Sequence, residues 1–158
     1  MLSGHYTDSH LFVLFLFFNA MIIKQAYGHV TIEMISDLRK ISKDKKMVSL
    51  DSRLYTPTAS DYQNCSRSTL ECFSKEVDVL FSESNDPVDK SYSRLSLKLK
   101  QLAFKVQNKD KTCPHCEVYE EQPPKVFIST LTKIVQELNN SKSQNQGSKR
   151  KRERVRQL

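Results

Sequence analysis

The segment from Cys113 to Phe127 constrains the fold more than any other part of the sequence. It combines two of the four cysteines with a double proline at the start of a strong helical pattern. Pro123 and Pro124 suit the first turn of a helix, where the backbone N–H groups have no partner within the helix. The apolar residues after them recur every three or four positions, which predicts an amphipathic helix over about residues 123–138. These residues are Phe127, Leu131, Ile134, Val135 and Leu138.

Three further helices are predicted from apolar residues at the same spacing, over about residues 30–48, 68–84 and 87–106. The run from Ser68 to Glu71 fits a capping box at the start of the second of these helices. Asp86 followed by Pro87 is typical of a helix start and places the third. Residues 49–66 have no helical period and are interpreted as a long connection.

The lengths of the connections indicate the topology. Long connections follow the first and third helices, whereas a short one joins the second helix to the third. A short link joins antiparallel neighbours and a long one can return the length of a bundle. We therefore predict an all-α fold, an up-up-down-down four-helix bundle of the growth-hormone and cytokine type. The sequence has no glycine-rich phosphate loop and no alternation of strands with helices, which argues against a nucleotide-binding α/β enzyme.

The N-terminal residues have the features of a secretory signal. An apolar run of 13 residues from Leu11 to Ile23 is too short to span a bilayer comfortably. Ala26 and Gly28 place small residues where a signal peptidase requires them. We predict a signal peptide over residues 1–28, a mature chain that begins near His29, and a secreted protein. A buried core strand or an uncleaved anchor are the alternatives, because no Lys or Arg precedes the run.

The four cysteines, Cys65, Cys72, Cys113 and Cys116, all lie in the predicted mature part. Three roles compete: a redox dithiol in the Cys-Pro-His-Cys run, a zinc site, and two structural disulfides. The first lacks a surrounding sheet and the second lacks a close-spaced pair in both halves, so we expect disulfides. Spacing alone leaves three disulfide connectivities open. A disulfide between either of the first two cysteines and either of the last two would close a loop of roughly 40 to 50 residues and contribute on the order of 4 kcal/mol to stability. We expect no enzyme activity, no metal and no cofactor.

The positive charge is concentrated at the C-terminus. Residues 139–158 contain seven Lys and Arg and one acid, in a chain of net charge +7. Residues 141–158 have no apolar stripe, so a disordered tail is predicted after a domain at 29–140. Its cations suit heparan sulfate or another polyanion: Lys149, Arg150, Lys151, Arg152, Arg154 and Arg156. A nuclear protein that binds nucleic acid through residues 149–156 is the alternative if the chain is not exported.

Two sequons could accept N-linked glycans. Asn139-Asn140-Ser141 follows the last predicted helix and is the expected site. Asn64-Cys65-Ser66 is less favourable, because its central cysteine is expected in a disulfide.

Several short motifs resemble one cytokine group. Tyr119-Glu120 followed by Pro123-Pro124-Lys125 and Phe127 resembles the start of the last helix in the interleukin-21 branch of the interleukin-2/15/21 group. Cys65 and the Cys72-Phe73 pair match the other cysteine spacing of that group. Leu54-Tyr55-Thr56 and the run from Ile35 to Ile41 are more similar to interleukin-15, the close alternative. The resemblance covers about residues 30–140.

The resemblance implies function, pairing and contacts. It implies disulfides Cys65–Cys113 and Cys72–Cys116. It also implies a secreted monomer that bridges a private receptor chain and the common gamma chain and activates Janus kinases in lymphocytes. By position, the resemblance assigns Asp37, Arg39, Lys98 and Lys100 to the private receptor and Gln136 to the gamma chain. The alternative interpretation of the two lysines is that they lie on a solvated helix face without a receptor contact. Asn139 occupies a position where the group has an apolar residue that contacts the gamma chain.

Overall fold

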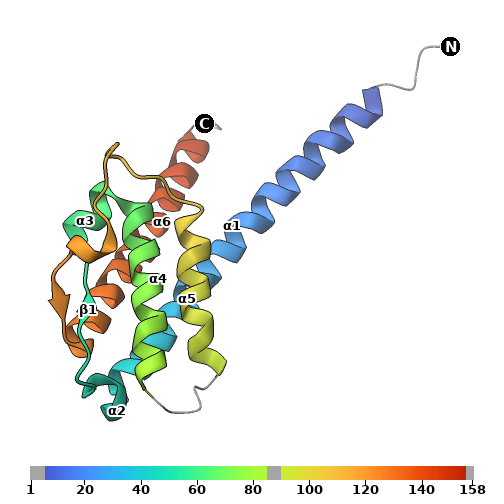
Figure 1. Ribbon diagram of the computed structural model, residues 1–158. Coiled ribbons are helices and arrows are strands. Elements are labelled where there is room, and N and C mark those ends of the chain that lie inside the picture. The colour runs from blue at the N-terminus through green and yellow to red at the C-terminus, as the bar shows by residue number, and fades with distance from the viewer. Residues whose placement is uncertain (1–5, 85–89, 156–158) are drawn as a thin grey trace.

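The computed structural model describes the backbone of residues 6–84 and 90–155, and the side chains of residues 11–19, 30–84 and 94–141. Four long helices dominate it: α1 (Tyr6–Lys43), α4 (Ser66–Glu83), α5 (Lys90–Ala103) and α6 (Pro124–Val155). Figure 1 shows that α1 and α4 run in one direction and α5 and α6 in the opposite one. The fold is therefore the all-α, up-up-down-down four-helix bundle that the connection lengths predicted.

The core lies where the apolar stripes of the four long helices meet. Met34 of α1, Phe73 of α4, Leu99 of α5 and Phe127 of α6 each have none of their surface exposed. The rings of Phe73 and Phe127 pack with their centroids 5.4 Å apart. The whole predicted stripe of α6, from Phe127 to Leu138, is buried. Burial of apolar surface on this scale is the main favourable term in folding.

The two long connections pass along the same side of the bundle and pair with each other (Figure 1). The first contains α2 (Lys45–Val48), β1 (Leu54–Tyr55) and α3 (Ala59–Asn64). The second contains the 3-10 turn η1 (Cys116–Val118) and β2 (Glu121–Gln122). The strands are antiparallel, with Leu54 opposite Gln122 and Tyr55 opposite Glu121. This short ladder fixes the register between the two connections.

Two disulfides attach the second connection to the α3–α4 segment. Cys65 is bonded to Cys113 and Cys72 to Cys116, which is the order that the resemblance implied. The sequence separations are 48 and 44 residues, so each bond closes a long loop. The chain-entropy model assigns about 4 kcal/mol to a loop of this length.

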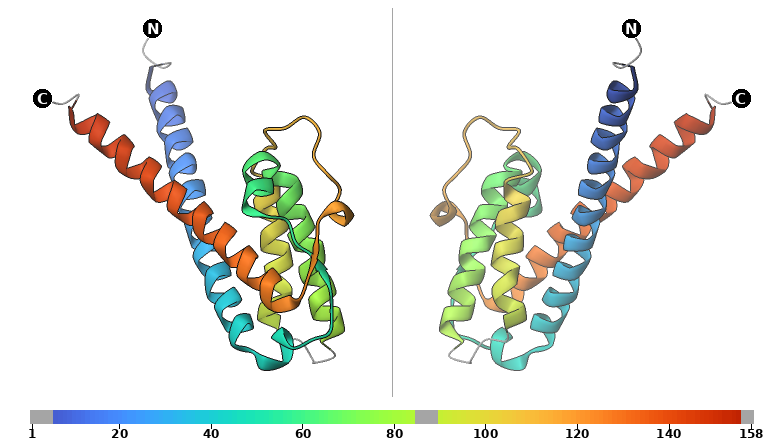
Figure 2. Two further views of the ribbon diagram at one scale, coloured as in Figure 1. Left: turned by 90° about the vertical axis from the view of Figure 1, so that its left-hand side faces the viewer. Right: turned by 90° about the vertical axis from the view of Figure 1, so that its right-hand side faces the viewer.

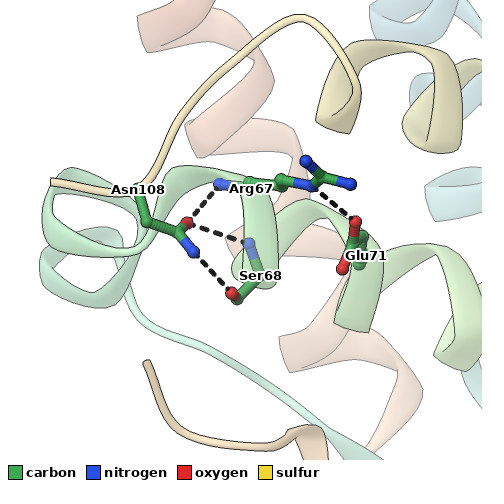
Figure 3. Close-up of polar contacts among 4 residues, drawn as sticks. All are labelled: Arg67, Ser68, Glu71 and Asn108. Carbon is green, nitrogen blue, oxygen red and sulfur yellow. Dashed lines mark hydrogen bonds and ion pairs between the residues drawn. The ribbon is translucent and has the colours of Figure 1, made fainter. Parts of the chain in front are cut away.

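Asn108, in the second connection, caps the N-terminus of α4 (Figure 3). Its Oδ1 accepts hydrogen bonds from the backbone N–H groups of Arg67 at 2.9 Å and Ser68 at 3.2 Å. Its Nδ2 donates to Oγ of Ser68 at 2.9 Å. The first N–H groups of a helix have no partner within the helix, so a distant side chain here supplies what a local cap normally does.

Three local predictions were wrong in detail. The first helix does not run unbroken to residue 48, because Asp44 leaves the helical conformation and its carboxylate caps α2. The connection at 49–66 contains α3, which begins with a capping box between Thr58 and Asp61. The second helix begins at Ser66, and Glu71 pairs with Arg67 at 2.9 Å rather than capping the start. The predicted helix start at Asp86-Pro87 lies outside the described residues.

The helices at both ends of the chain are longer than predicted. Helix α1 extends back to Tyr6, into the expected signal peptide, and α6 extends to Val155, through most of the expected disordered tail. Figure 2 shows both extensions projecting away from the α4–α5 pair. The α6 extension is rich in Lys, Arg and Gln, which favour helix, and neither extension contains a proline after the first turn. Helical backbone therefore continues beyond the packed region at both ends.

Candidate functional site

An ion-pair cluster joins α1 to α5 and includes two of the predicted private-receptor residues, Asp37 and Lys98. Nζ of Lys98 lies 2.9 Å from Asp37 and 3.2 Å from Glu33. Asp37 is only 8% exposed. Burial lowers the pKa of Lys98, but the hydrogen bonds and charges of Asp37 and Glu33 outweigh it, so the pKa lies above its ordinary value. Lys98 therefore stays charged and binds α1, and the structure brings it together with Asp37.

The two predicted lysines of α5 face different neighbours. Lys100 lies 3.2 Å from Asp78 of α4, with both side chains about half exposed. Residues two apart on a helix are separated by about 200° around its axis, which explains why Lys98 faces α1 and Lys100 faces α4. Exposed pairs of this kind contribute little to stability, so Lys100 remains accessible to a partner. The structure separates the two residues that the resemblance placed on one surface.

Two exposed apolar residues lie on the outward sides of α1 and α5, and sequence reasoning missed them. Ile32 on α1 is 60% exposed and Leu97 on α5 is 54% exposed. Arg39 is exposed on the same side of α1 as Ile32 and forms no ion pair with the described residues. We define the α1–α5 face as the outward surface of these two helices, with Ile32 and Arg39 on α1, turned away from Asp37, and Leu97 and Lys98 on α5. Ile32 and Leu97 could have been identified as exposed from the sequence, because they lie off the buried stripes of their helices.

Gln136 and Asn139 lie on the edge of α6. Gln136 is half-buried beside the fully buried Val135. Oδ1 of Asn139 accepts a hydrogen bond of 2.9 Å from the hydroxyl of Thr31, which is itself fully buried on α1. Asn139 therefore helps to join α1 to α6. We define this α1–α6 edge by Thr31, Gln136 and Asn139; it borders α1 on another side from α5.

A second site that sequence reasoning missed is an acidic face around the paired connections. Glu76 of α4 is buried beneath β1, where its Oε2 accepts a hydrogen bond of 3.0 Å from the N–H of Tyr55. Burial is the main reason that the pKa of Glu76 is raised, the Tyr55 N–H opposes this, and the charges of Glu117 and Glu121 raise it further. Beside them Val118 is 71% exposed. We define the acidic face as Tyr55, Glu76, Glu117, Val118 and Glu121.

The pKa of Tyr55 responds to the same charges. It is raised, with the charge of Glu121 as the largest cause, followed by burial and a hydrogen bond to Glu121. Several carboxylates therefore act together at this face, from α4, η1 and β2. The clustering could have been anticipated for Glu117 and Glu121, which are close in sequence, but not for Glu76, which arrives from another helix.

The remaining predicted sites are less well described. The cations of the tail from Lys149 to Arg154 belong to α6, but their side chains are outside the described residues, as is all of Arg156. Among the described residues, no group of His, Cys, Asp and Glu side chains is arranged to hold a metal ion. No helix in the described residues is long and apolar enough to cross a membrane.

Comparison with known proteins supports one cytokine family. The sequence model of the interleukin 15 family matches residues 11–140. Interleukin-15 of Bos taurus is 29% identical over 105 residues, covering 65% of this chain and 64% of that protein. Interleukin-15 of Oryctolagus cuniculus is 30% identical over 111 residues, covering 69% and 68%. Interleukin-15 of Homo sapiens is 28% identical over 141 residues, covering 86% and 85%.

These relatives are cytokines, and they support the interleukin-15 alternative better than the interleukin-21 assignment that the segment before α6 suggested. The chain spans just under two thirds of the bovine relative's length and more of the human one. The match over residues 11–140 covers most of the 158-residue sequence, including at least part of each of the four bundle helices and both disulfides. On this evidence, and on a fold of four helices in the expected order, the chain belongs to the interleukin-15 family.

Proposed function

We propose that this chain is a secreted interleukin-15-like cytokine that holds a private receptor chain and the common gamma chain together. Bringing the two receptor chains together activates Janus kinases in lymphocytes. The observation that carries the proposal is the position of α1, which contributes to two different surfaces. The α1–α5 face lies on one side and the α1–α6 edge on another, so two receptor chains can contact one small bundle at once.

Export is supported by the way the N-terminal segment sits outside the core. Every residue from Leu11 to Phe18 is exposed, and Phe18 is 71% exposed. A run of large apolar side chains that contacts no core is unfavourable in water. Such a run is expected to be recognised by the translocation machinery and to be absent from the mature protein. The buried stripe that the structure describes on α1 lies after the predicted cleavage site and includes Thr31 and Met34. Removal of residues 1–28 would therefore leave these core residues in place.

The α1–α5 face is suited to the private receptor chain. Ile32 and Leu97 offer apolar contact area, and Arg39 offers a charge that nothing in the described bundle neutralises. Asp37 and Lys98 act mainly on each other, and we propose that they hold α1 and α5 in register for the receptor. The acidic face is suited to a receptor chain with a basic surface, since charge complementarity speeds encounter and suppresses wrong partners. Lys100 is a peripheral contact in this arrangement.

Gln136 is the proposed centre of the gamma-chain contact. Its side chain lies beside the buried stripe without belonging to it, so it can meet a receptor without disturbing the core. A few central residues carry most of the energy of an interface, so one charge placed there can cost 2 kcal/mol or more, roughly 30-fold in affinity. Asn139 borders this contact and also remains the predicted glycosylation site.

The experiment is to separate the two contacts. Gln136→Asp should keep private-receptor binding and helicity but abolish signalling, which makes it a competitive antagonist. Arg39→Glu should weaken the private receptor first. Binding to each purified receptor ectodomain, with kinase-pathway activation in responsive lymphocytes, measures both effects. Glu137→Gln is the matched control, because Glu137 is exposed on the same helix but turned about 100° away from Gln136.

Two results would contradict this proposal. One is full signalling by Gln136→Asp in a folded protein. The other is retention of the full-length chain inside expressing cells, with residues 1–28 still attached. The second result would favour the nuclear, nucleic-acid-binding alternative that uses residues 149–156.

A further inference from the structure

An exposed basic cluster lies at the end of the bundle where α1 turns into α2. Five cations fall between residues 40 and 53, against the two acids Asp44 and Asp51. We define the basic corner as these five residues, all of which are exposed: Lys40, Lys43, Lys45, Lys46 and Arg53. Figure 1 places α2 at the opposite end of the bundle from the C-terminal end of α6, so the corner is separate from the basic tail.

Four of the five charges of the basic corner are not neutralised by the described residues. Lys40, Lys43, Lys45 and Arg53 form no ion pair with any described residue. The nearest acid in sequence, Asp44, is engaged as the cap of α2, where its Oδ1 accepts a hydrogen bond of 2.9 Å from the N–H of Lys46. Interaction with helix dipoles explains a preference for lysines in the last turns of α1 and α2, but it does not explain Arg53, which precedes a strand.

The apolar residues of this segment point inward, which limits the kinds of partner that the basic corner can bind. Ile41, Met47 and Leu54 are at most 5% exposed, and Val48 and Leu50 pack against the core. No aromatic side chain lies between residues 40 and 53 to stack on a nucleic-acid base. No exposed large apolar side chain is available there to enter a membrane. What remains is a purely electrostatic surface, which fits a flexible, highly charged polymer.

We propose that the basic corner binds sulfated glycosaminoglycans such as heparan sulfate. The sulfates of the polysaccharide would replace the counterions around the five cations, so the affinity should fall steeply as salt is raised. Bound in this way, the cytokine would be held at cell surfaces. The α1–α6 edge would remain open, whereas Arg39 of the α1–α5 face lies one position before Lys40. The polysaccharide would therefore compete with the private receptor and not with the gamma chain.

The test measures heparin affinity at several salt concentrations with the full chain. The triple variant Lys43→Ser, Lys45→Ser and Arg53→Ser should bind heparin about tenfold more weakly near 0.15 M salt and show a shallower salt dependence. The matched control removes the same number of exposed cations elsewhere: Lys75→Ser, Lys109→Ser and Lys133→Ser. It should retain most of the affinity. Circular dichroism checks that both variants are folded, and Lys45→Arg, which keeps the charge, should bind like the parent.

Each of the following outcomes would refute the proposal. Equal losses in the triple variant and its control would mean that only net charge matters. Loss only when the cations of the tail, residues 149–156, are neutralised would assign binding to the tail instead. Desulfated heparin that binds as well as heparin, or vesicles of anionic lipid or duplex DNA that bind more tightly, would also overturn it. Heparin binding is measured on the purified protein, and the proposed export determines only where the protein would encounter the polymer. A failed signalling assay would therefore not change the result of the heparin test.

Discussion

Replacing Asn108 with Ala tests how the second connection stabilises α4. The substitution removes the acceptor of two first-turn N–H groups, those of Arg67 and Ser68, and the donor to the Ser68 hydroxyl. It leaves the Cys65–Cys113 disulfide in place, so the loop cannot drift away from the helix. The N–H groups must then find water at a site where Ser68 is half-buried.

The expected cost follows from the number of bonds lost. Removing an N-cap side chain typically costs about 1 kcal/mol, within a range of about 0.5–2. Because one side chain here serves two N–H groups and a hydroxyl, we expect about 1.5 kcal/mol. For a domain of roughly this size, that corresponds to a fall in Tm of several degrees. Urea unfolding of the mature protein with its disulfides intact measures the change directly.

Asn108→Asp is the matched control. It keeps the acceptor for both N–H groups and adds a negative charge at a helix N-terminus, which is favourable. Its stability should equal or exceed that of the parent. If Asn108→Ala unfolds with the parental midpoint, or if Asn108→Asp is destabilised as much as Asn108→Ala, the capping explanation is refuted.

Two further predictions concern buried charges. Lys98→Met leaves Asp37 buried without its cation and should lower the free energy of unfolding by about 2 kcal/mol, and adding Asp37→Asn should recover much of the loss; a single variant as stable as the parent would contradict this. Glu76→Gln keeps an acceptor for the Tyr55 N–H and should stabilise the protein at pH 7. Because the pKa of Glu76 is raised above its ordinary 4.5 in the folded state, the parent loses stability as pH rises through that window. The advantage of Glu76→Gln should therefore be full above the window and vanish below about pH 4.5 in urea titrations.

The long helices could be predicted from the sequence because each must bury one stripe. The spacing of Phe127, Leu131 and Leu138 has a single solution, a helix with that face inward, and the connection lengths then restrict the topology. The positions at which a helix is interrupted were harder to predict from the sequence. The end of α1 depends on whether the Asp44 side chain caps a new helix or stays on the surface, and propensity does not decide between them.

The candidate site was only partly predictable. The positions of Asp37 and Lys98 came from the resemblance, but their mutual contact depends on how α1 packs on α5. Glu76 and Asn108 could not be found, because each acts on a segment distant in sequence, Tyr55 for one and Ser68 for the other. At the end of α6, helical backbone continues through a segment where the absence of an apolar stripe had suggested disorder.

Both cross-links of the molecule lie after Thr58, and α1 has none. The disulfides bind α3 and α4 to the second connection, so the part of the chain from α3 to η1 can hold together when other contacts loosen. Helix α1 is held by its apolar stripe, the Thr31–Asn139 hydrogen bond and the Lys98 cluster, and by no disulfide. Sub-global opening should begin there. Since α1 contributes to both proposed receptor surfaces, a preparation on storage would lose potency while its disulfides and most of its helix remained intact.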